Sequence, residues 1–243
     1  MESISVNKFI SSTGFCSRRA ADKLLDEGRV KINGVLAKKG NRVEAGDRVT
    51  VDGNPIETQT ELVYLLLNKP VGITCTTDLK DKDNIIDFIN YPSRIFPVGR
   101  LDKPSQGLII MTNDGDIVNK ILRAGNAHEK EYIVTVTKPI TNQFIKAMSN
   151  GVPILGTMTK KCTVKKINAH NFSIILTEGM NRQIRRMCEY FDYKVSRLKR
   201  TRIMHLRLQG IANGKWRHLT EAELKQLKQA VQYSSKTEEA SKK

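Results

Sequence analysis

The stretch that decides the fold is residues 97–116, which read PVGRLDKPSQGLIIMTNDGD. Four consecutive apolar residues at 108–111 predict a short buried strand, and the Asn-Asp-Gly that follows predicts a turn. Before the strand comes a loop with polar and charged side chains between two glycines: Arg100, Asp102, Lys103 and Ser105. Because reacting side chains are often presented by loops that a rigid strand holds in place, this loop is the first candidate for chemistry.

Outward from this strand, residues 62–232 contain more strand-like runs than helical ones. Further strands are predicted from the runs VYLLLN, KEYIVTV, NFSIILT and VSRLKRTRIM, and helices near 115–124, 141–149, 181–191 and 221–231. The last helix begins with a capping box at Thr220-Glu221-Ala222-Glu223. Strands and helices do not alternate regularly, which favours an α+β fold with a largely antiparallel mixed sheet flanked by helices over a doubly wound parallel fold.

Residues 1–55 have the pattern of a separate small domain of helices and short strands. Helices are predicted over about 5–12 and from an N-cap at Ser17 to a stop at Gly28. Asn33-Gly34 predicts a tight hairpin, and two further short strands follow around a glycine turn. The polar segment 54–61 suits a linker, and the polar tail 233–243 is expected to be mobile.

The charge of the chain points to a polyanionic partner. Lys and Arg number 41 against 25 Asp and Glu, which gives a net charge of +16. Residues 181–210 hold nine Lys or Arg and two acids, so the excess is concentrated. Nucleic acid is the leading partner and a membrane surface the weaker one. The chain shows neither an apolar run of about 18 residues nor an export leader, so a cytoplasmic protein is expected.

Several classes of site are not predicted. The four cysteines and four histidines are widely spaced and form no metal-binding or disulfide pattern, so neither a metal nor a disulfide is expected. The phosphate-binding, dinucleotide-binding and nucleophile-elbow motifs are absent from the sequence. Any catalysis is therefore expected to depend on side chains of the chain itself.

Three candidate groups each have a plainer structural interpretation. Asp102 fits an exposed turn carboxylate or an ion-pair partner of Arg100 or Lys103. Tyr132 in HEKEYIV fits a core ring with its hydroxyl at the surface. In EGMNRQIRRMCEYF, helical spacing places apolar residues on one face and Arg182, Arg185 and Arg186 on the other, which also fits a solvated arginine face.

Two resemblances decide between these interpretations. Residues 5–51 resemble the small RNA-binding domain named after ribosomal small-subunit protein four. Four ordered segments resemble the signature segments of the RNA pseudouridine synthases: LLLNKPVGITCT at 65–76, FPVGRLDKPSQGLIIMTNDGD at 96–116, HEKEYIVTV at 128–136 and EGMNRQIRRM at 178–187. Within that family the chain looks most like the ribosomal RNA branch and, in that branch, the F group of enzymes that act on large-subunit RNA. The resemblance spans residues 4–232.

The resemblance to the synthases implies roles for matching residues. Asp102 would be the catalytic carboxylate, as a nucleophile or a general base. Tyr132 would lie against a flipped uracil, and Arg185 would pair with Asp102. RNA contacts are implied or expected at seven further residues: Lys69, Arg100, Arg182, Arg186, Arg18, Arg19 and Lys23. Lys69 would also shape the floor of the pocket, together with Pro70.

The implied reaction is the isomerisation of a uridine to pseudouridine in large-subunit (23S) ribosomal RNA, and also in the anticodon of tyrosine tRNA. No cofactor is needed, because no group is added and nothing is oxidised. A monomer is expected. The carboxylate either attacks the sugar or removes its 2′ proton, and the sequence leaves both routes open. The alternatives are a noncatalytic RNA-binding or ribosome-assembly protein and, more remotely, a nucleoside glycosidase that releases uracil.

Overall fold

The computed structural model describes residues 3–57 and 61–234, which form two compact units. The first unit falls within Met1–Val63 and adds Tyr91–Ile95, and the second comprises the described residues of Tyr64–Asn90 and Phe96–Lys243. The expected linker and mobile tail lie partly outside the described residues, at 58–60 and 235–243. Across the described ranges, none of the helices has the length and apolar character needed to cross a membrane.

The first unit packs two helices against short strands. The helices are α1 (Val6–Ser12) and α2 (Arg18–Asp26), and the strands are β1 (Ile4–Ser5), β2 (Val30–Ile32), β3 (Val35–Leu36), β4 (Arg42–Val43), β5 (Val49–Val51) and β6 (Asn54–Pro55). The hydroxyl of Ser17 accepts a hydrogen bond from the backbone N–H of Ala20, so the predicted N-cap is confirmed. Ala21 and Leu25 on α2 are buried with Val6 and Ile10 of α1.

The predicted hairpin of the first unit is confirmed. Asn33 and Gly34 have φ values of 51° and 82°, as a tight turn with two left-handed residues requires, and they join the antiparallel strands β2 and β3. The two following strands, β4 and β5, belong to different sheets. β4 pairs with β1, whereas β5 pairs with β2 and β6 in a sheet of order β3-β2-β5-β6.

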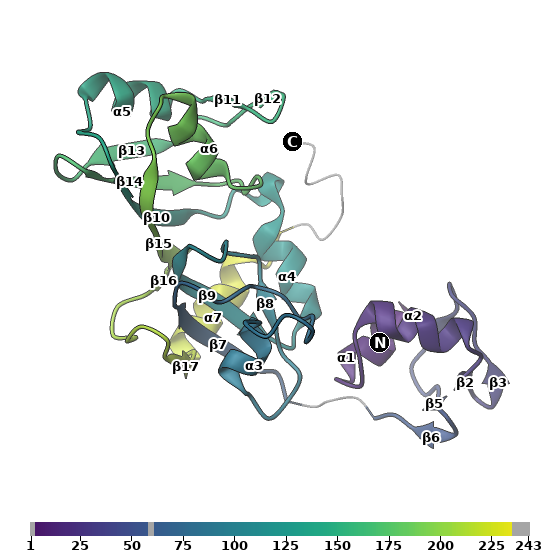
Figure 1. The fold of residues 1–243 in the computed structure, drawn as a ribbon. Helices are drawn as coiled ribbons and strands as arrows, with labels where there is room; N and C mark the ends of the chain where they lie inside the picture. Colours follow the sequence, from purple (N-terminus) through teal and green to yellow (C-terminus); the bar gives the residue numbers. More distant parts are fainter. Residues whose placement is uncertain (1–2, 58–60, 235–243) are drawn as a thin grey trace. The chain divides into compact units, whose positions relative to one another are not determined.

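The second unit is built on a nine-stranded sheet (Figure 1). The order along its main path is β13-β14-β10-β15-β9-β7-β17, with β16 beside β15 and β8 beside β9. The strands are β7 (Tyr64–Lys69), β8 (Phe96–Val98), β9 (Gln106–Thr112), β10 (Lys130–Val136), β13 (Thr163–Lys166), β14 (Asn171–Leu176), β15 (Val195–Ile203), β16 (Leu206–Arg207) and β17 (Trp216–His218). Every pair is antiparallel except β15 with β9, which confirms the predicted mixed, largely antiparallel α+β fold.

Helices pack on both halves of this sheet (Figure 1). They are α3 (Ile85–Ile89), α4 (Gly115–Leu122), α5 (Asn142–Ser149), α6 (Gln183–Tyr190) and α7 (Glu221–Ala230), with a 3-10 turn at Ala124–Asn126 and a small hairpin of β11 (Pro153–Ile154) and β12 (Thr157–Met158). α4 and α7 bury Ile117, Ile121 and Leu227 against the half that holds β7 and β9. Phe144 of α5 meets Phe172 of β14 edge to face in the other half. The predicted capping box at Thr220 and Glu223 is confirmed.

The parallel contact of β15 with β9 joins the two halves of the sheet. It rests on two residue pairs, Lys199 with Gln106 and Arg200 with Gly107. Gly107 has a φ of 108° and is buried. A side chain at this position would collide with the backbone of Arg200, so only glycine permits the strands to lie this close. The loop before β9 is thereby held beside β15.

Candidate functional site

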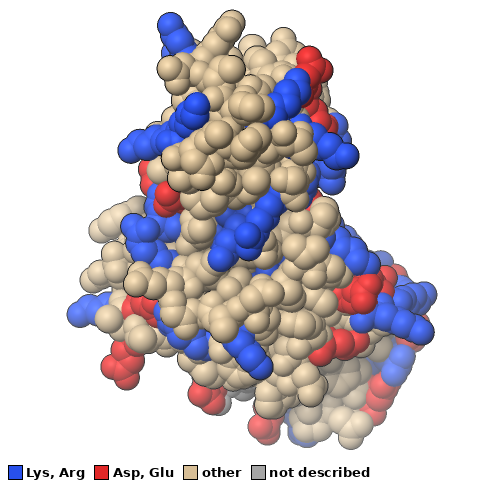
Figure 2. All heavy atoms as spheres, turned by 60° about the vertical axis from the view of Figure 1, so that its left-hand side comes forward, with Lys and Arg blue, Asp and Glu red and all other residues tan. Residues whose placement is uncertain are grey.

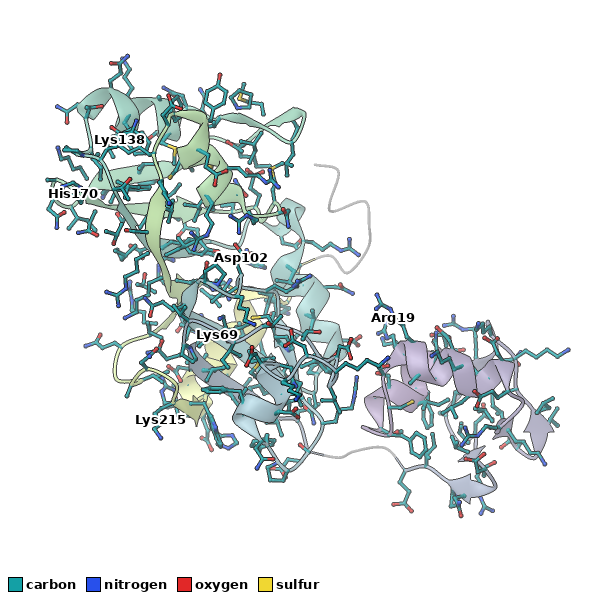
Figure 3. All side chains as sticks on the ribbon, viewed as in Figure 1. Arg19, Lys69, Asp102, Lys138, His170 and Lys215 are labelled. Carbon is teal, nitrogen blue, oxygen red and sulfur yellow. The ribbon has the colours of Figure 1, made fainter. Side chains whose placement is uncertain are left out.

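The loop that precedes β9 is fixed at several points of its backbone. The N–H of Ser105 donates to the carbonyl of Asp102 at 2.9 Å, and the N–H of Gly72 donates to the carbonyl of Lys103 at 2.9 Å. The N–H of Leu101 donates to the Cys75 thiol at 3.3 Å. These bonds hold the loop in one shape, and the side chain of Asp102 lies between the two halves of the sheet (Figure 3).

Asp102 lines a pocket of about 390 Å³ in the second unit. The pocket walls are formed by residues 99–102, by β10 and β15, and by the segment 178–184 that leads into α6. The Asp102 side chain is 32% exposed. The carboxylate therefore faces a concavity in which a ligand can meet it, which agrees better with the catalytic interpretation than with a solvated turn.

Arg185 is the cationic partner of Asp102. Its Nε lies 3.8 Å from Oδ2 of Asp102, an ion-pair distance that is longer than a hydrogen bond. The guanidinium is anchored by donation from Nη1 to the carbonyl of Val195 at 3.3 Å and from Nη2 to the Ser105 hydroxyl at 3.2 Å. Burial lowers the pKa of Arg185, as does the charge of Arg182, whereas Asp102 raises it. The arginine is thus a fixed charge behind the carboxylate.

The burial of Arg185 differs from the expected helix face. Helical spacing in the sequence placed it on the same polar face as Arg182 and Arg186, and one interpretation left that face solvated, but only 8% of Arg185 is exposed. Arg182 is the N-cap of α6 with a φ of 51°, so the helix begins after it and the two arginines do not share a face. Arg182 is exposed at the pocket, while Arg186 bonds to the Asn181 carbonyl at 3.1 Å and does not line the pocket.

Tyr132 is the third residue of β10 and lines the pocket. It is buried and pairs with Arg200 of β15 and with Ile174 of β14. Arg100 is exposed and lines the same pocket as Asp102 and Tyr132. The structure therefore brings together five of the ten residues singled out from the sequence: Asp102, Tyr132, Arg185, Arg100 and Arg182.

Lys69 lies at the end of β7 beneath the site (Figure 3) and is wholly buried. Its ammonium donates to the carbonyls of Pro70 at 2.8 Å and Ile73 at 2.7 Å. Burial lowers the pKa of Lys69, and the nearby Cys75 and Asp102 oppose that effect. The side chain has no surface with which to touch RNA in this structure, and its position fits the other expected role, which is to shape the pocket floor with Pro70.

The remaining expected RNA contacts lie in the first unit. Arg18, Arg19 and Lys23 are exposed on α2, the helix that Ser17 caps (Figure 3 labels Arg19). Among the described residues, no group of three or more His, Cys, Asp or Glu is arranged to hold a metal ion.

Sequence reasoning missed two buried cations of the pocket, Lys130 and Arg200. Burial and the charge of Arg200 lower the pKa of Lys130 to about 8. Strand alternation offered a signal for Lys130, because residues two apart on a strand share a face and Tyr132 was already a candidate. Arg200 had no such signal, since its place depends on the pairing of β15 with strands far away in the sequence.

Comparison with known proteins gives two family matches along the chain. The RNA pseudouridylate synthase family matches residues 63–190, and the S4 domain matches residues 6–49. Dual-specificity RNA pseudouridine synthase RluF of Salmonella typhi is 59% identical over 95% of this chain and 80% of its own length. RluF of Escherichia coli K12 is 57% identical over 96% and 81%.

More distant relatives also carry the name of pseudouridine synthase. Ribosomal large subunit pseudouridine synthase B of Bacillus subtilis is 34% identical over 92% of this chain and 95% of its own. A crystal structure described as pseudouridylate synthase superimposes with a TM-score of 0.68 at 29% identity, covering 92% of this chain and 99% of that one.

Proposed function

This chain belongs to the RNA pseudouridylate synthase family, and we propose that it converts a specific uridine of large-subunit (23S) ribosomal RNA to pseudouridine. The observation that carries the proposal is the Asp102 carboxylate in its pocket, 3.8 Å from the anchored Arg185 and beside the ring of Tyr132. A protein that only binds RNA has no need of a carboxylate amid positive charge, because that carboxylate repels phosphates.

The pocket residues supply what the reaction requires. The bond between C1′ of the ribose and N1 of uracil breaks, the base turns, and a bond forms between C1′ and C5. The C5 proton is then lost and N1 gains one, so atoms and electrons balance without a cofactor. Asp102 acts either by attack on C1′ or by removal of the 2′ proton, and Arg185 orients it and balances its charge. Tyr132 supplies a face on which an everted uracil stacks.

The RNA must also be held while the target nucleotide leaves its stack. Lys and Arg gather in groups on the molecular face drawn in Figure 2, one of them near the middle of the view among uncharged atoms. At the rim of the pocket, Arg100 and Arg182 are exposed and available to phosphates. We assign the same role to Arg18, Arg19 and Lys23 in the first unit, and to Arg186 near α6.

The proposal includes a second RNA substrate. The two relatives with 59% and 57% identity are named as dual-specificity enzymes, and the family resemblance implies the anticodon of tyrosine tRNA as the second target. We further propose a working monomer, because the chain carries its own RNA-binding unit in addition to the catalytic one. Ribosomal RNA and tRNA are cytoplasmic in bacteria such as these relatives, and we place the protein there too.

Primer extension after carbodiimide treatment tests the function directly, because the adduct on pseudouridine stops reverse transcriptase. RNA from cells with and without this protein is compared, with 23S ribosomal RNA in one arm and tyrosine tRNA in the other. We expect one stop in 23S RNA that disappears without the protein, and a second in the tRNA. Identical stop patterns in both arms, with and without the protein, would contradict the proposal.

A further inference from the structure

Two cations of the pocket have no part in the chemistry outlined above. Lys130 begins β10 and Arg200 lies on β15, and both line the wall that also carries Tyr132. They are almost completely buried, with 7% of Lys130 and 3% of Arg200 exposed. Burial of a charged group is costly unless an opposite charge accompanies it, so two such residues in one pocket call for an explanation.

The hydrogen bonds of the two side chains leave donors unused. Lys130 Nζ donates to the carbonyl of His128 at 3.1 Å, and Arg200 Nε donates to the carbonyl of Leu108 at 2.7 Å. Nη2 of Arg200 is buried and has no hydrogen-bond partner. Over the described ranges, the ion pairs within 4.0 Å include neither residue. The unused donors therefore belong to cations that lack a counter-charge.

The carboxylates that line the pocket are engaged elsewhere. Asp102 pairs with Arg185. Oε1 of Glu178 accepts from the Gln183 side-chain amide at 2.7 Å and from the backbone N–H of Lys160 at 3.0 Å. Neither carboxylate offsets the burial of Lys130, whose pKa is lowered to about 8 by burial and by the charge of Arg200. A lysine with this pKa is still charged at neutral pH. The pocket therefore carries two positive charges without a counter-charge among the described residues, which favours the binding of an anionic ligand.

A one-residue change of register places these charges beside the stacking surface. Glu131 pairs with Arg202, whereas the next residue, Tyr132, pairs with Arg200. The shift sets Arg200 directly across from Tyr132, and such irregularities often re-aim a side chain at a functional site. Lys130 is two residues before Tyr132 on β10, about 6.6 Å along the strand. Both charges are thus within the dimensions of one nucleotide from the ring.

We propose that Lys130 and Arg200 bind a phosphodiester that flanks the everted uridine. The inference rests on the proposed function and adds a binding subsite to it. A phosphodiester supplies the full negative charge that two buried cations need, which a uracil carbonyl does not. A contact with this phosphodiester can also be kept throughout the reaction. The base must detach and turn, so contacts with it cannot be kept, whereas contacts with the backbone can.

The test measures binding of RNA stem-loops that contain the target uridine found by primer extension. In one stem-loop the 5′ linkage of that uridine carries a neutral methylphosphonate, and in another the 3′ linkage does. Wild-type affinity should fall about 10- to 100-fold for one of the two, because a charge-assisted contact is lost. Lys130→Met should weaken binding of unmodified RNA by a similar factor. The same variant should bind that methylphosphonate RNA and the unmodified RNA with equal affinity, because the contact is already lost.

Matched variants separate this subsite from general charge effects. Lys130→Arg should restore binding, and Lys225→Met, which removes an exposed lysine of α7, should leave it unchanged. The salt dependence of binding gives a second readout. The slope of log affinity against log salt should become shallower by about one unit in Lys130→Met and not in Lys225→Met. Circular dichroism melting verifies that each variant is folded.

The outcomes distinguish the subsite from the function itself. If wild-type protein forms pseudouridine but binds both methylphosphonate RNAs as tightly as the unmodified one, the subsite is wrong and the function stands. Equal affinities of Lys130→Met and wild type would have the same meaning. If wild-type protein binds the RNA and leaves its uridine unchanged, the proposed function fails irrespective of the subsite.

Discussion

The absent side chain of Gly107 lets the backbone of Arg200 pass directly over it. A Cβ on Gly107 would lie 2.2 Å from the carbonyl oxygen of Arg200 and 2.7 Å from its nitrogen. This contact is part of the only parallel pairing in the nine-stranded sheet as described, between β9 and β15. It sets the distance between the loop of Asp102 and the strand that carries Arg200.

Gly107→Ala should therefore destabilise the second unit by at least about 3 kcal/mol, because the methyl group clashes with backbone and the φ of 108° strains alanine. Gly156→Ala is the control. Gly156 also has a positive φ, of 73°, but open space where its Cβ would be, so the cost should be about 1 kcal/mol. Urea denaturation measures both, and equal losses would contradict the close-approach argument.

Arg185→Lys tests how the carboxylate is positioned. Lysine keeps the charge but cannot reproduce the hydrogen bonds to Val195 and Ser105 that fix the guanidinium. We expect kcat to fall about 100-fold with little change in KM, since misplacement of a reacting group costs about that much. Arg207→Lys, on the exposed face of β16, should retain wild-type kinetics. A change in KM alone would indicate a role in binding instead.

Lys130 gives a prediction about pH and stability. Its pKa is about 8 in the folded protein against 10.5 ordinarily, so folding opposes its protonation. The resulting penalty is fully present below pH 8 and disappears as pH rises to 10.5. Relative to Lys130→Met, the wild type should gain up to about 3 kcal/mol of unfolding free energy across that window. Denaturation at pH 7 and pH 10.5 measures the difference, and a constant difference would contradict the burial of an uncompensated charge.

Local features of this molecule were predictable from sequence, and long-range ones were not. The hairpin at Asn33-Gly34 and the capping box at Thr220 depend on residues adjacent in the chain, and both are confirmed. The strand of 108–111 was recognisable because it is continuously apolar, and it forms the centre of β9.

The features that escaped prediction depend on distant pairing. Arg185 is buried with its guanidinium against Ser105, in the loop before β9 and 80 residues away in the chain, which helical spacing alone does not reveal. The position of Arg200 requires both the missing Cβ of Gly107 and the register change opposite Tyr132. The short helix α3 was missed as well, since five residues are too few to show a helical period.

The central claim is that the carboxylate of Asp102 performs the chemistry, and the most direct measurement is tritium release from RNA labelled at C5 of uridine. Asp102→Asn keeps the shape of the side chain and removes its charge, while Asp192→Asn makes the same change at an exposed turn. We predict that Asp102→Asn binds the RNA within about threefold of wild type, a difference below 1 kcal/mol. It should release no tritium, whereas Asp192→Asn should release it at the wild-type rate. Substantial tritium release by Asp102→Asn would contradict the account.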